Sequence, residues 1–164
     1  MKDTLVLGLG NPLRGNDGAG IRAAEKVDRQ VDNVDVRPSI KSGAALLDFL
    51  RGYERVFIID AVAVESGTVG EWWAVSPDEL RKLSEDNRFS HELSFPVVLD
   101  LLDKEGFNPE ITFFLIGVED QSGFEVTLKG ELCQQVNKAV DSLTDDIVNR
   151  LEPGERPSKG KVTS

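Results

Sequence analysis

The residues from Leu5 to Gly20 place the strongest constraint on how this chain can fold. They read L-V-L-G-L-G-N-P-L-R-G-N-D-G-A-G, an apolar run that stops at Gly10 and a glycine-rich segment before a helical pattern. This order is typical of a buried strand, a tight loop and a helix N-terminus. Glycine lets a backbone approach a ligand closely, and the free N–H groups of a helix start favour negative charge. Because Asp17 stands there, we expect the loop to hold a carboxylate where a phosphate loop would hold phosphate.

Two nucleotide-binding motifs come close to this stretch and fail. The dinucleotide fingerprint G-x-G-x-x-G fits Gly8 and Gly10 but has Leu13 at its third glycine. The P-loop lacks its lysine and its hydroxyl residue, because Asn16 and Asp17 occupy those positions. A bound nucleotide is therefore disfavoured. The alternative is that Asp17 is an ordinary acid in the first turn of a helix.

Composition disfavours several classes of partner. The chain has 164 residues and a formal net charge of −10, which makes nucleic acid a poor partner because phosphate contacts need clustered Lys and Arg. A single cysteine excludes an intramolecular disulfide and a cysteine-rich zinc site. No apolar stretch is long enough to span a bilayer and no signal peptide is visible. We therefore expect no membrane partner and a cytoplasmic location.

Strand and helix patterns alternate along the chain. Strands are expected at residues 5–9, 34–40, 55–59, 72–75 and 111–118. Three of them are apolar throughout, as in sheets that are covered on both faces. The pattern predicts an α/β fold, a three-layer sandwich with a mostly parallel five-stranded sheet and helices on both faces, in which the Trp72 strand is a candidate antiparallel edge. We expect one domain over residues 1–151 and a disordered tail, rich in Pro and Gly, over residues 152–164.

Two smaller features concern packing. Trp72 and Trp73 are neighbours on a strand, so one ring is expected to face inward and the other outward or into an interface. Cys133 falls within the last helical pattern, near its apolar face, and is expected to be a core residue.

Three titratable groups are candidates for chemistry. Asp17 follows the first strand, Asp60 comes directly after the apolar run 55–59, and His91, the single histidine, precedes a helical pattern. Ligands of parallel sheets bind beyond the carboxyl ends of the strands, and a carboxylate that ends an apolar run is costly to desolvate unless it is paired. Two carboxylates and one imidazole suit a divalent transition metal. The alternatives are a capping or turn role for Asp60 and a surface or capping role for His91.

These residues together resemble the hydrogenase maturation endopeptidases. The resemblance rests on G-L-G-N-P-L-R-G-N-D-G-A-G, then I-I-D-A, then a histidine before a helix, and it covers about residues 3 to 150. It implies an enzyme that removes the C-terminal peptide of the nickel–iron hydrogenase large-subunit precursor. It also implies that Asp17, Asp60 and His91 are the metal ligands and the catalytic residues. Nickel would be carried by the substrate, with cadmium or zinc as possible surrogates, and cleavage would follow nickel insertion.

The chain departs from the family pattern at a few positions. Asn16 stands where the family often has the first of two acids, Lys41-Ser42-Gly43 replaces a Gly-Gly-Thr-like turn, and Asp120 lies near a usual Pro. The latter two changes bear on the identity of the substrate and leave the reaction class unchanged. Two alternatives remain at this point: a peptidyl-tRNA hydrolase, which shares G-L-G-N-P but needs a histidine soon after it, and a non-catalytic metal- or nucleotide-binding module.

Overall fold

A five-stranded sheet forms the centre of the molecule. The computed structural model describes residues 3–40, 43–83, 85, 95–119 and 131–152. The strands are β1 (Thr4–Leu9), β2 (Asp35–Ser39), β3 (Arg55–Val64), β4 (Trp72–Val75) and β5 (Glu110–Glu119), and their order in the sheet is β2-β1-β3-β5-β4. All neighbouring strands are parallel except β4, which runs antiparallel to β5 at the edge. This confirms the predicted sheet and its antiparallel edge.

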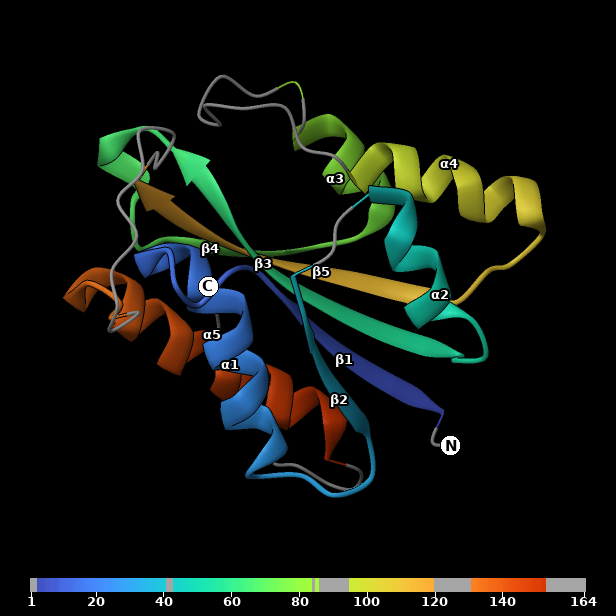
Figure 1. The fold of residues 1–164 in the computed structure, drawn as a ribbon, viewed down its shortest axis with the longest axis horizontal. Helices are drawn as coiled ribbons and strands as arrows, with labels where there is room; N and C mark the ends of the chain where they lie inside the picture. The colour runs from blue at the N-terminus through green and yellow to red at the C-terminus, as the bar shows by residue number, and fades with distance from the viewer. Residues whose placement is uncertain (1–2, 41–42, 84, 86–94, 120–130, 153–164) are drawn as a thin grey trace.

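Helices cover both faces of the sheet. The described helices are α1 (Ala19–Asp28), α2 (Leu47–Leu50), α3 (Pro77–Leu83), α4 (Phe95–Glu105) and α5 (Gln134–Leu151), with short 3-10 turns η1 (Gly15–Gly18), η2 (Gly43–Leu46) and η3 (Ser66–Thr68). Figure 1 shows α1 and α5 on one face and α2, α3 and α4 on the other. The predicted three-layer sandwich is therefore confirmed. Within the described residues, no helix has the length and apolar character needed to cross a membrane.

The continuous apolar strands are explained by two separate cores. In β3, Val56 and Ile58 pack towards α2 and α4, whereas Phe57 and Ile59 pack towards α1 and α5. A strand buried on both faces needs apolar residues at every position. Trp72 and Trp73 follow the same rule, because each is partly buried against a different core. The expectation that one of these two rings faces outward is therefore wrong, and its alternative, a ring in an interface, stays a prediction.

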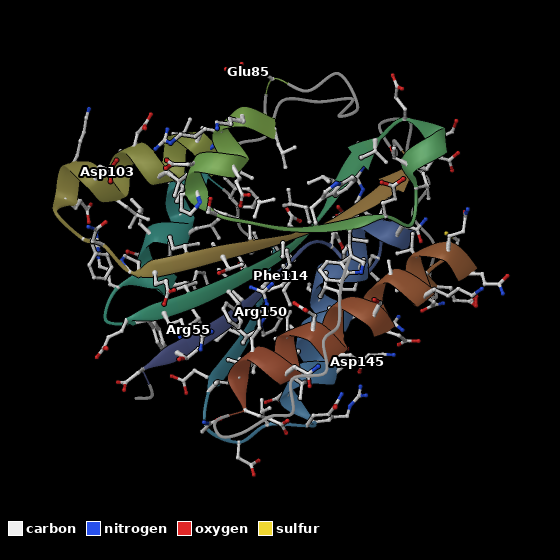
Figure 2. The ribbon with its side chains drawn as sticks, turned by 180° about the vertical axis from the view of Figure 1, so that it is seen from behind. Arg55, Glu85, Asp103, Phe114, Asp145 and Arg150 are labelled. Atoms are coloured by element: carbon white, nitrogen blue, oxygen red, sulfur yellow. The ribbon has the colours of Figure 1, made fainter. Side chains whose placement is uncertain are left out.

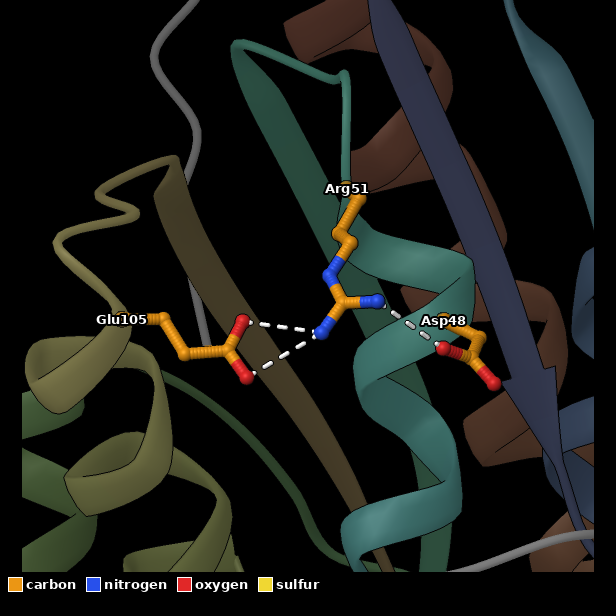
Figure 3. A network of polar contacts seen from close by, with 3 residues as sticks. All are labelled: Asp48, Arg51 and Glu105. Atoms are coloured by element: carbon orange, nitrogen blue, oxygen red, sulfur yellow. Dashed lines mark hydrogen bonds and ion pairs between the residues drawn. The ribbon is translucent and has the colours of Figure 1, made fainter.

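A helix cap and a set of exposed ion pairs add polar contacts on the face that carries α2, α3 and α4. Ser76 and Glu79 form a reciprocal cap at the start of α3: the Ser76 N–H donates to Glu79 Oε1 at 2.8 Å, and the Glu79 N–H donates to Ser76 Oγ at 3.2 Å. In Figure 3, Arg51 links Asp48 of α2 to Glu105 at the end of α4, with hydrogen bonds of 2.9 to 3.1 Å. Exposed ion pairs of this kind contribute about 0–1 kcal/mol each, so the apolar cores dominate stability.

The face that carries α5 has one further contact with the sheet. The guanidinium of Arg150 lies 5.2 Å from the centre of the Phe114 ring of β5, and both residues are labelled in Figure 2. Arg150 also pairs with Asp146 one helical turn away. The C-terminal end of α5 is thus anchored on the sheet by a cation–π contact as well as by apolar packing.

Cys133 differs from its prediction. It is exposed and lies just before α5, with an extended backbone, so it is not a core residue. The helical spacing from Leu132 to Leu151 is genuine, but the helix begins at Gln134. The predicted tail spans residues 152–164, of which all but Glu152 lie outside the described residues, so the domain limits stay a prediction.

Candidate active site

At the carboxyl end of the sheet, β3 and β5 extend beyond β1. The last pair between β1 and β3 is Gly8 with Ile59, whereas the pairing of β3 with β5 continues through Asp60 with Leu115 to the end of both strands. Asp60 therefore lies within β3, and the expectation that the strand ends there is wrong. The strand continues through residues 61–64 because each of these residues pairs with a residue of β5. Asp60 is the first residue of β3 after its last pair with β1.

The chain turns sharply where β1 ends. Gly10 has φ 138°, a conformation that L side chains rarely adopt, and its N–H donates to the Ser39 carbonyl at 3.1 Å. A Cβ at this position would lie 2.0 Å from the Asp17 carbonyl oxygen. The backbone of the Asp17 turn thus rests directly on Gly10, which returns Asp17 to the carboxyl edge of the sheet.

The carboxylate of Asp17 is held by its own loop. The Asn11 N–H donates to Asp17 Oδ2 at 2.9 Å, and the Asp17 N–H donates to the Arg14 carbonyl at 3.1 Å. The Asn11 side chain in turn accepts the Leu13 N–H at 3.0 Å. Asn11 therefore stabilises the loop through both its backbone and its side chain. Asp17 is partly buried, and one of its carboxylate oxygens is held in place by a hydrogen bond.

Asp60 is an unusual carboxyl group. The pKa of Asp60 is raised to about 8, first by burial and then by the negative charge of nearby Asp17, whereas a hydrogen bond from the Ala61 backbone lowers it in part. The structure thus brings together the two acids that the sequence singled out. Because one of them is desolvated and both repel each other, the pair suits a divalent cation with oxygen ligands.

The third predicted ligand is not placed. His91 lies outside the described residues, so its part in the site stays a prediction. Within the described part of the chain, no group of three or more His, Cys, Asp or Glu side chains comes close enough together to hold a metal ion. The described acids would therefore need a further ligand, and His91 is our candidate for it.

The structure adds a residue that the sequence did not assign to the site. Asn16 precedes Asp17 in η1, and its Oδ1 accepts the Cys133 N–H at 2.8 Å. The two residues are 117 positions apart in the chain. No local pattern signals such a contact.

Exposed apolar side chains occur at the carboxyl edge of the sheet. Among the described residues, the large hydrophobic side chains that are exposed are Leu13, Ile40 and Val97, with exposed fractions of 54%, 75% and 58%. Leu13 follows the end of β1 and Ile40 follows the end of β2, so both belong to the carboxyl edge of the sheet. This edge therefore presents apolar surface beside two acids.

Comparison with known proteins identifies the family. The hydrogenase maturation protease family matches residues 20–150 of this chain. The chain belongs to that family. The matched range contains Asp60 but begins after Asp17. The glycine loop that carries Asp17 is therefore linked to the matched residues of this protease by the fold.

Two relatives show how far the similarity extends. A Methanocaldococcus jannaschii protein, provisionally named a hydrogenase maturation protease, is 28% identical over 157 residues, which are 92% of this chain and 97% of that protein. The hydrogenase expression/formation protein HupD of Rhizobium leguminosarum is 34% identical over 112 residues, or 65% of this chain and 54% of HupD. The aligned part thus spans about half the length of HupD.

Solved structures share the fold of this protease. HybD of Escherichia coli superposes with a TM-score of 0.70 at 23% identity, covering 92% of each chain. HybD of Thermococcus kodakarensis gives a TM-score of 0.68 at 24% identity, covering 93% of this chain and all of that one. Family membership makes the protein a hydrolase, and it favours the endopeptidase over the peptidyl-tRNA hydrolase and the non-catalytic module.

Proposed function

We propose that this protein removes the C-terminal peptide of a nickel–iron hydrogenase large-subunit precursor after nickel has been inserted. The observation that carries the proposal is the pairing of Asp17 with the desolvated Asp60 on the carboxyl edge of a maturation protease fold. Two carboxylates that repel each other are favourable for folding only when a proton or a cation offsets their charge. A nickel ion carried by the substrate would supply that charge.

The proposed roles follow from the environment of each residue. Asp17, held by the Asn11 N–H, presents an oriented carboxylate, whereas Asp60 loses its proton when a cation comes within reach. His91 is proposed as the third ligand, because imidazole nitrogen and carboxylate oxygen together suit nickel. An ion held there would polarise the scissile carbonyl or activate water. Cadmium and zinc are proposed as surrogates for binding experiments.

A folded protein is the proposed substrate. The exposed side chains of Leu13 and Ile40 follow strand ends on the same carboxyl edge of the sheet as the acids, and exposed apolar residues that gather on a surface commonly mark contacts with another protein. The precursor would cover them when its C-terminal segment reaches the acids. A cytoplasmic location stays a prediction of the sequence.

Incubation with a nickel-loaded large-subunit precursor tests this function. We expect one cut near the precursor C-terminus, seen as two products by intact-mass analysis. The Asp17→Asn variant should cleave at least about 100-fold more slowly, because it removes one negative charge from the site. Circular dichroism would establish that the variant is folded. Cuts at several sites, or an undiminished rate for Asp17→Asn, would contradict the proposal.

A further inference from the structure

We propose that Asn16 is a positioning residue, which fixes the Asp17 turn to the start of α5. This inference rests on the proposed function of the Asp17 and Asp60 pair. The observation behind it is the 2.8 Å hydrogen bond from the Cys133 N–H to Asn16 Oδ1. Asn16 and Asp17 are consecutive residues of η1, so a constraint on one of them limits the movement of the other.

The bond links the turn to a well-supported element. α5 has 18 residues, and its buried side runs from Val136 to Leu151 against the core that it shares with α1. Its start is therefore a fixed reference point. The two bonds to Asp17 itself come from Asn11 and Arg14, which belong to the same loop and would move with it. The Asn16 bond instead ties the loop to a separate part of the fold.

An amide suits this position better than a carboxylate. Both groups offer an oxygen that accepts the Cys133 N–H, but a carboxylate would add a third negative charge beside two acids that already repel each other. Asparagine keeps the acceptor and leaves the charge out. This gives a physical reason for the replacement of an acid at position 16.

Four single variants, and the double variant Asn16→Ala with Cys133→Pro, test the role of Asn16. Asn16→Ala removes the acceptor. Cys133→Pro removes the donor N–H at a residue whose φ of −69° proline can adopt. Asn16→Asp restores an acceptor. Asn149→Ala makes the same chemical change on an exposed part of α5, far along the helix from Cys133.

Two readouts apply to each variant: kcat and KM on nickel-loaded precursor, and the affinity for cadmium ions alone by calorimetry. Loss of one hydrogen bond corresponds to about a tenfold change. We therefore expect Asn16→Ala and Cys133→Pro each to lower kcat and cadmium affinity about tenfold, with KM for the precursor within about twofold. The double variant should be no worse than either single one, because the bond can be lost only once. Asn16→Asp should give a higher kcat than Asn16→Ala because it restores the acceptor, but a lower kcat than the wild type because of its added charge, and Asn149→Ala should match the wild type.

Specific outcomes would overturn the inference. Wild-type kcat and cadmium affinity in Asn16→Ala would remove Asn16 from the site, and so would additive losses in the double variant. Equal impairment of Asn16→Asp and Asn16→Ala would show that the acceptor is not what matters. If the wild-type protein does not cleave the precursor, the proposed function fails. The cadmium titrations and the additivity of their losses then still decide the role of Asn16.

Discussion

Asp60→Asn is expected to abolish cleavage and, at the same time, to stabilise the metal-free protein at neutral and alkaline pH. Both effects arise from the negative charge of Asp60. The folded state disfavours this charge, whereas the proposed reaction requires it. Cleavage should fall at least about 100-fold, since asparagine cannot supply the negative charge of a ligand or a base. Stability should rise because the neutral amide removes both the desolvated charge and its repulsion by Asp17.

The direction of the pH dependence follows from the pKa. Asp60 titrates near about 8 in the folded protein, whereas an unfolded chain has an aspartate pKa of about 3.9. The folded state therefore keeps a proton that the unfolded state releases, and the free energy of unfolding falls as pH rises through this window. The stabilising contribution is fully present below the unfolded pKa and is lost as pH rises through the folded pKa.

The size of the effect is reduced by solvent. One pKa unit corresponds to about 1.36 kcal/mol, but the Asp60 side chain is partly exposed, so water screens part of the cost of its charge. We therefore expect Asp60→Asn to gain about 2–3 kcal/mol at pH about 9 and nothing near pH about 4. Denaturant melts in the presence of a chelator, across this pH range, would measure the gain.

Asp145→Asn is the matched control for this measurement. Asp145 is exposed on α5 and is labelled in Figure 2, so the same chemical change there should leave the pH dependence as it is in the wild type. A wild-type pH profile for Asp60→Asn would show that Asp60 is not a desolvated carboxyl group. Wild-type cleavage by the same variant would remove it from the site.

Gly20→Ala is expected to have the largest effect on folding. A Cβ at Gly20 would lie 2.4 Å from the Leu9 carbonyl oxygen and 2.5 Å from the Ile59 carbonyl oxygen. Both atoms belong to strand backbones, so α1 would have to move away from β1 and β3. Overpacking of this kind costs about 1–3 kcal/mol, and we expect the upper end, a fall in Tm of roughly 6–12 °C for a chain of this size. Thermal melts followed by circular dichroism would measure it.

The same substitution should also impair cleavage. Gly20 follows Asp17 by three residues, whereas Asp60 lies in β3, so displacement of α1 away from β3 would shift Asp17 relative to Asp60. Gly67→Ala is the matched control, because nothing lies within 4 Å of a Cβ there. Equal melting temperatures for the two variants would contradict the close packing of α1 on the sheet.

Much of the architecture was predictable because local residue types determine it. The apolar runs of β1, β3 and β5 require a sheet covered on both faces, and the glycines after β1 require a close turn. Asp17 could be placed at the carboxyl edge for the same reason. These features follow from residues that are adjacent in the sequence.

The errors concern features that depend on distant residues. The sequence pattern predicts that the strand ends at Asp60, because a charged residue interrupts an apolar run there. Pairing with β5 instead extends β3 to Val64. The pattern also predicts that Cys133 lies in the last helix, because Leu132 fits the helical spacing of the apolar residues that follow it. The structure shows that α5 begins at Gln134. The bond between Asn16 and Cys133 joins two such distant segments, so no sequence pattern predicts it.

Paired cleavage of nickel-loaded and nickel-free precursor tests whether the protein recognises its substrate through nickel. Both forms should be incubated with the wild-type protein under identical conditions, and the products followed by intact-mass analysis over time. If the acid pair engages nickel held by the substrate, the nickel-free precursor lacks the anchor that brings its scissile bond to Asp17 and Asp60. We expect a single cut in the nickel-loaded precursor and an intact nickel-free precursor. Cleavage of both forms at the same rate would contradict recognition through nickel.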